Sequence, residues 1–140
     1  GLALAQGIEE SGWGTSRFAL QGNAVFGQWT FSKGAGLVPK ERDEGASHEV
    51  KVFPTLAGSV RQYVRNLNNH RAYREFRRER AVFRAADSPM DSRTLAKTMT
   101  RYSQRGAEYV SSILGLITMN KLDQLDRARL GANTRPALDS

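Results

Sequence analysis

Two adjacent carboxylates, Glu9 and Glu10, end an apolar segment in the stretch IEESGWGTSRF. A Ser-Gly-Trp-Gly turn follows, so both belong to the last turn of a helix predicted over residues 2–11. Three effects would raise the pKa of Glu10: the negative end of the helix dipole, burial against the indole of Trp13, and repulsion from Glu9. A carboxylic acid still protonated near neutral pH can act as a general acid. The alternative is that both glutamates are ordinary solvated residues.

The helical spacing of this first segment separates the two carboxylates. Successive residues are about 100° apart around a helix, so Glu9 and Glu10 point to different sides. Leu4, Ile8 and Ser11 share one stripe, which we predict to be the buried face. Glu10 borders this stripe on a flank of small side chains, where we expect a groove.

The rest of the pattern predicts a mostly α-helical (α+β) domain with a small β-lobe. Residues 22–36 are rich in glycine and aromatic side chains and predict an ordered loop, whereas residues 36–53 predict a β-hairpin. Further helices are expected after the hairpin, where apolar residues recur at helical spacing. They begin near Thr55 or Ser59, near Tyr73, at Ser92 and after Gly106.

The length of 140 residues is most simply that of one domain, which we place at residues 1–130, followed by a flexible tail at 131–140. The first residues already belong to the predicted helix. We therefore expect the sequence to begin inside a longer chain, with any export signal upstream. No apolar run approaches the length of a membrane-spanning helix.

The composition excludes several kinds of chemistry. Cysteine is absent, which excludes disulfides, thiolate metal sites and a cysteine nucleophile. The only two histidines, His48 and His70, lack ligand spacing, so we predict no metal and no cofactor. The net charge of +7 is concentrated in residues 61–105, which hold twelve basic and four acidic side chains. Such a surface attracts polyanions, but we expect no nucleic-acid partner because no RNA- or DNA-binding motif accompanies it.

The stretch LALAQGIEESGWGTSRFALQGNAVFGQW resembles glycoside hydrolase family 73, a family of peptidoglycan-cleaving N-acetylglucosaminidases. These enzymes show an Ala-Gln-x-x-x-Glu-Ser-x-Trp-Gly segment followed by Asn-x-Phe-Gly. The GNA-x-FGQW, GLVPK and HEVxxF elements are most similar to the bacterial Bax-type branch. Later elements, ending in YSQRGAEYVSSI, extend the resemblance over residues 2–118. The resemblance implies a lysozyme-like fold in which a helical lobe and a β-hairpin lobe flank a cleft.

The resemblance also implies roles for single residues. They are Glu10 for the general acid, Ser11 and Trp13 for the turn that orients it, Phe26 and Gly27 for the glycan-binding loop, and Tyr102 for a tyrosine beside the sugar. Asn23 stands one position before the site of the family's asparagine, which is Ala24 here. Trp29 would offer a further apolar face for sugar rings. Because Leu95 and Met99 share a predicted helical stripe with Tyr102, a core role for Tyr102 is the alternative.

A second carboxylate is usually needed to hydrolyse a β-glycoside, and in the family it lies on the hairpin. Glu44 is favoured by counting forward from the Phe-Gly pair, and Glu41 by counting back from the end of the hairpin. Glu49 ranks third because it shares a strand face with Lys51 and could be one half of an ion pair. The 2-acetamido group of the substrate could also replace this carboxylate.

We therefore expect an endo-β-N-acetylglucosaminidase that hydrolyses the GlcNAc-β-1,4-MurNAc bond of bacterial peptidoglycan. It would act as a monomer in the periplasm or outside the cell, with glycan strands as its partner. The alternatives are a lytic transglycosylase, which forms an anhydro product, a muramidase, and a cell-wall-binding domain without activity.

Overall fold

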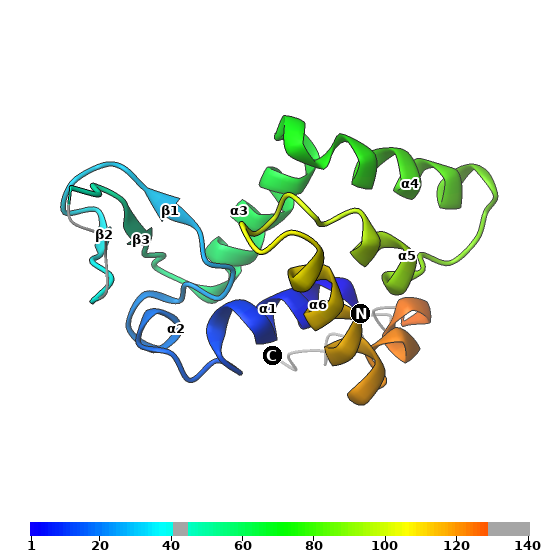
Figure 1. Ribbon diagram of the computed structural model, residues 1–140, viewed down its shortest axis with the longest axis horizontal. Coiled ribbons are helices and arrows are strands. Elements are labelled where there is room, and N and C mark those ends of the chain that lie inside the picture. Colours follow the sequence, from blue (N-terminus) through cyan, green and yellow to red (C-terminus); the bar gives the residue numbers. More distant parts are fainter. Residues whose placement is uncertain (41–44, 129–140) are drawn as a thin grey trace, which may run out of the picture.

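The computed structural model describes residues 1–40 and 45–128, and Figure 1 shows a helical body with a small sheet at one side. The elements in chain order are α1 (Leu2–Ser11), α2 (Arg17–Gly22), β1 (Trp29–Thr30), β2 (Gly36–Leu37), β3 (Glu49–Lys51), α3 (Leu56–Asn69), the 3-10 helix η1 (Arg71–Tyr73), α4 (Arg74–Ala85), α5 (Ser92–Lys97), α6 (Ala107–Met119) and the 3-10 helix η2 (Leu122–Arg127). The fold is mostly α-helical with a small antiparallel sheet, as predicted. The predicted tail at 131–140 lies outside the described residues.

The sheet has the strand order β1-β3-β2, so β3 is its centre. Leu37 of β2 pairs with Val50 of β3, which confirms an antiparallel pairing inside the predicted hairpin. Trp29 of β1 pairs with the other edge of Val50. The loop predicted over residues 22–36 thus contains a strand that the sequence pattern missed. With two residues, β1 is too short to show an alternating pattern.

The buried face of α1 differs from the predicted stripe of Leu4, Ile8 and Ser11. Leu4 is 51% exposed, and the buried residues are Leu2, Ala5, Gln6 and Ser11. The predicted stripe did not include Gln6, which is fully buried and hydrogen-bonded to the hydroxyls of Tyr63 and Tyr109. The end of the helix is as predicted, since Gly12 adopts the left-handed conformation with φ of 56°.

Two helix starts are now assigned to particular side chains. Thr55, one of the two predicted caps, accepts a hydrogen bond from the Gly58 amide at the start of α3. For α5 the start predicted at Ser92 was wrong by one residue. Asp91 caps this helix by accepting a 2.6 Å hydrogen bond from the Thr94 amide. The helix ends at Lys97, so Met99 and Tyr102 lie in the turns that follow rather than on its stripe.

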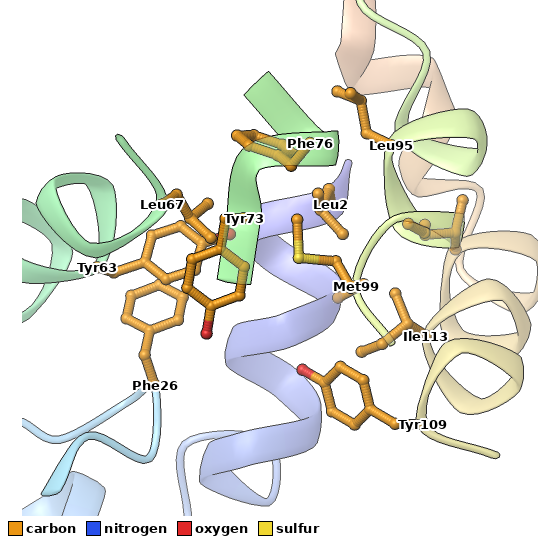
Figure 2. Packing of buried hydrophobic residues seen from close by; sticks show 13 residues of the cluster. Leu2, Phe26, Tyr63, Leu67, Tyr73, Phe76, Leu95, Met99, Tyr109 and Ile113 are labelled. Atoms are coloured by element: carbon orange, nitrogen blue, oxygen red, sulfur yellow. The ribbon is translucent and has the colours of Figure 1, made fainter. Parts of the chain in front are cut away.

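The core packs around α6, whose Ile113 and Ile117 are completely buried. It continues to Met99 and to an aromatic group in which Phe26 stacks on Tyr63 at 4.0 Å between ring centroids. Figure 2 shows these aromatic rings together at one side of the cluster. Across residues 1–40 and 45–128, no helix has both the length and the apolarity that crossing a membrane requires. The stacked rings of Phe26 and Tyr63 belong to this core.

Candidate active site

A cleft of about 1000 Å³ opens beside the last turn of α1. It is lined by segments that lie far apart in the sequence. These are Glu10, Phe26–Trp29, Lys51 of β3, Gln62 and Asn66 of α3, His70, Tyr73, and residues 101–105 before α6. Among the described lining residues, Glu10 is the only carboxylate. The described part of the cleft therefore has one acid, together with aromatic and cationic side chains.

The carboxylate of Glu10 is in close contact with the backbone at Gly27. A Cβ added at Gly27 would lie 2.5 Å from Glu10 Oε2, so only a glycine fits there without displacing the carboxylate. Gly27 also has φ of 59°, a conformation that favours glycine. The Phe-Gly pair identified in the sequence thus serves to bring the loop against the acid.

A chain of hydrogen bonds orients the carboxylate from the other side. The Tyr63 hydroxyl donates to Gln6 Oε1 at 2.6 Å, and Gln6 Nε2 donates to the Tyr109 hydroxyl at 3.1 Å. Tyr109 is also hydrogen-bonded to Glu10, and Figure 2 shows its hydroxyl directed toward α1. Because an amide NH₂ group can only donate, the proton of Tyr109 is free to point at Glu10. The buried amide of Gln6 therefore sets the direction of the whole chain.

The pKa of Glu10 is raised above its ordinary value. Burial is the largest cause, the hydrogen bond from Tyr109 opposes it, the charge of Glu9 adds to it, and Arg105 opposes it. Repulsion from Glu9 was expected from the sequence. The predicted cover by Trp13 is not seen, since this indole is 62% exposed and does not line the cleft. The pKa of Glu10 is thus shifted in the direction that a general acid requires, and burial is the largest cause.

Tyr109→Phe should move the alkaline limb of the pH-activity profile to higher pH. Loss of the hydroxyl removes a donor that stabilises the carboxylate, so the pKa of Glu10 rises further and the acid keeps its proton to higher pH. The measurement is kcat/KM on glycan strands against pH. Tyr102→Phe is the control because that hydroxyl donates to the Phe26 carbonyl at 3.1 Å. An unchanged or more acidic limb in Tyr109→Phe would contradict the assignment.

Three aromatic side chains predicted from the sequence line the cleft. Phe26 is buried against Tyr63, and Tyr102 is partly buried with its hydroxyl on the Phe26 carbonyl. Trp29 is 53% exposed and stacks with one face on His48 at 4.2 Å. The Trp29 indole therefore lies at the cleft in a fixed orientation that suits stacking on a sugar ring.

Ser11 and Asn23 lie outside the residues that line the cleft, and both bind backbone. The Ser11 hydroxyl donates to the Gly7 carbonyl and accepts a 2.7 Å bond from the Gly14 amide, which holds the turn after α1. Asn23, in the left-handed conformation at the end of α2, donates to the Phe53 carbonyl at 2.9 Å. Both residues position the segments that carry Glu10 and Gly27.

The three candidates for the second carboxylate have different outcomes. Glu49 is only 4% exposed, does not line the cleft, and accepts hydrogen bonds from the Gly34 and Gly36 amides at 3.0 and 2.9 Å. The Glu49 carboxylate is therefore directed into the connection between β1 and β2. Glu41 and Glu44 lie outside the described residues, and their role stays a prediction.

Several cleft residues were missed by the sequence reasoning. They are Gln28, Lys51, Gln62, Asn66, His70, Tyr73, Arg101, Ser103, Gln104 and Arg105. Tyr109 was also missed as a partner of the acid, although it lies in the YSQRGAEYVSSI element that carried the resemblance.

Glu9 accepts hydrogen bonds from the Arg105 guanidinium at 2.6 Å and from the Ser112 hydroxyl at 2.9 Å. Within the part of the chain that the structure describes, no group of three or more histidine and acidic side chains could hold a metal.

Comparison with known proteins places this cleft in a family. The model of the family described as "Mannosyl-glycoprotein endo-beta-N-acetylglucosaminidase" matches residues 1–122. The chain is 34% identical over 120 residues to Protein bax of Escherichia coli (strain K12). The aligned segment covers 86% of the chain and 42% of that relative. The chain therefore spans less than half the length of this relative. No solved structure matches it significantly. By the family model and the motifs around Glu10, the chain belongs to the glucosaminidase family, glycoside hydrolase family 73.

Proposed function

We propose that this domain is an endo-β-N-acetylglucosaminidase that hydrolyses the GlcNAc-β-1,4-MurNAc bond of bacterial peptidoglycan. The observation that carries the proposal is the single acid of the described cleft, Glu10, whose pKa burial raises, in a chain of the glucosaminidase family. The cationic lining, with Lys51, Arg101 and Arg105, suits an anionic wall polymer.

In this proposal Glu10 donates its proton to the bridging oxygen as the bond from that oxygen to C1 of N-acetylglucosamine breaks. Water adds to C1 and loses a proton, which finally returns to Glu10, and the product has a new reducing end on N-acetylglucosamine. Glu10 is a carboxylate between these two proton transfers. The Tyr109 hydroxyl and the Arg105 charge then stabilise it, since both favour the ionised form.

Four groups are candidates for activating the water or stabilising the charge at C1. Three are carboxylates of the hairpin and one belongs to the substrate. Glu44 stays first and Glu41 second. Glu49 ranks third because its carboxylate already accepts two backbone hydrogen bonds. An inverting reaction would place the second carboxyl roughly 6.5–9.5 Å from Glu10, and the 2-acetamido group of the substrate is the alternative nucleophile.

The proposed place of action is the periplasm or the outer side of the cell, because peptidoglycan is found there. Cleavage within glycan strands would make the enzyme an autolysin if it acts on the wall of its own cell. We also propose that the domain acts as a monomer.

The test is the digestion of purified peptidoglycan, with the new sugar ends identified by mass spectrometry. Reducing N-acetylglucosamine ends are the expected product. Anhydromuramic ends would instead show a lytic transglycosylase, and reducing N-acetylmuramic ends a muramidase. No release from any wall preparation would leave a wall-binding domain without activity. Each of these three results would overturn the proposal.

A further inference from the structure

A second groove, of about 640 Å³, runs beside the active-site cleft along α3. The two hollows share Lys51 and Gln62 in their linings. The second groove also contains Arg61, Arg65 and Asn68, which do not line the cleft. A ligand held in the cleft can therefore extend past Gln62 into the groove without leaving the protein surface.

The spacing of residues on α3 explains why the two hollows adjoin. Gln62 and Asn66 are four residues apart and line the cleft, whereas Arg61, Arg65 and Asn68 follow the spacing i, i+4, i+7 on the neighbouring stripe. Gln62 and Arg65 are three residues apart, and side chains at this spacing on a helix lie about 5–6 Å apart. A branch on the polymer could thus cross from the catalytic cleft to the arginine stripe within the length of one or two residues.

The groove is cationic. Lys51, Arg61 and Arg65 line it, and no acidic side chain of the described residues does. Arg61 and Arg65 are exposed, and within residues 1–40 and 45–128 neither guanidinium takes part in an ion pair. Arg80 adds a further guanidinium at the groove edge, where it donates to Asn68 at 2.7 Å. The charge of the groove is therefore available to an anionic ligand.

We propose that this groove binds the carboxylates of the peptide stem that is attached to the muramic acid of the substrate. The inference rests on the proposed function, in which the glycan occupies the cleft. The sugar backbone carries few charges, whereas the peptide stem carries several carboxylates that guanidinium groups bind well. The peptide branches from the strand beside the bond that is cut, so it matches a groove that adjoins the cleft. A polyanion that is not attached to the glycan strand would not be held beside the cleft in this way.

The first test compares peptide-bearing glycan strands with the same strands after an amidase has removed the peptides. The double variant Arg61→Gln/Arg65→Gln should lower kcat/KM on peptide-bearing strands about fivefold, as two exposed ion pairs would. Its kcat/KM on peptide-free strands should stay the same. The control, Arg74→Gln/Arg78→Gln, removes the same charge from exposed positions of α4 that line neither hollow. Equal losses on both substrates, or an equal loss in the control, would overturn the inference.

A second test needs no catalysis and so separates this inference from the proposed function. The free tripeptide alanyl-γ-glutamyl-diaminopimelate is titrated into the domain while backbone amide signals are followed by NMR. Signals from residues 58–69 should shift in the native domain and not in Arg61→Gln/Arg65→Gln. If peptidoglycan is not cut but these shifts appear, the proposed function fails and the groove assignment stands. If the signals respond to a polyphosphate chain and not to the tripeptide, the peptide assignment is overturned.

Discussion

Glu10→Gln is expected to lower the rate of glycan cleavage by about 10³-fold, the usual contribution of a well-placed general acid. Glutamine has the shape of the acid and can still accept the hydrogen bond from Tyr109, but it has no acidic proton to transfer to the leaving oxygen. The measurement is the release of reducing ends from peptidoglycan at fixed enzyme concentration. More than a tenth of the native rate in Glu10→Gln would show that another group protonates the leaving oxygen.

Glu9→Gln is the matched control, because it makes the same chemical change one residue earlier. Glu9 lies outside the cleft lining and binds Arg105 and Ser112 instead. Its activity at the optimal pH should stay within about threefold of the native rate, since it touches no reacting atom. A loss as large as that of Glu10→Gln would show that catalysis needs both glutamates and not Glu10 alone.

Glu10→Gln should leave the stability of the folded protein at neutral pH unchanged or increase it. Because burial raises the pKa of Glu10 above 4.5, the folded protein holds this proton more tightly than the unfolded chain. The stability that Glu10 contributes is therefore complete below about pH 4.5 and is lost as the pH rises through the raised pKa. Glutamine does not titrate, so the melting temperature at pH 7 should hold or rise. A clear fall would mean that the lost activity reflects damage to the fold.

The local features of this site could be predicted from the sequence. The left-handed Gly12 ends α1 directly after Glu10, and both the glycine and the acid lie within one short motif. The Phe26-Gly27 pair was likewise assigned to a loop that meets the substrate, and both residues line the cleft. The end of α1 could be predicted because it depends on residues a few positions apart, whereas the Phe26-Gly27 loop was expected from the family resemblance and its contact with substrate stays a prediction.

The features that were missed depend on residues far apart in the chain. Gln6 is buried because it meets Tyr63 and Tyr109, which are 57 and 103 positions away. No helical periodicity can signal such a pairing, so the hydrophobic pattern selected Leu4 for the core instead. The strand β1 was missed for the same reason, since its two residues become a strand only by pairing with β3. Long-range polar contacts thus set both the face of α1 and the hydrogen bond on the acid.

Gly27→Ala is expected to lower activity about 100-fold with only a small loss of stability. The added Cβ would lie 2.5 Å from Glu10 Oε2 and 3.4 Å from Glu10 Cδ. These atoms are the end of a flexible side chain, so the conflict is relieved by moving the carboxylate rather than the backbone. A displacement of about 1 Å in a catalytic group can reduce the rate by two orders of magnitude. The measurement is kcat/KM on peptidoglycan together with the melting temperature.

Gly34→Ala separates this steric effect from the strain of the backbone. Gly34 has φ of 78°, on the same side as the 59° of Gly27, but a Cβ at Gly34 meets nothing within 4 Å. Both variants should therefore lose about 1 kcal/mol of unfolding free energy from the left-handed conformation. Only Gly27→Ala should also lose catalytic activity. If both variants stay equally active, the position of the Glu10 carboxylate against Gly27 is not needed for catalysis. If both lose activity equally, the loss comes from strain in the loops.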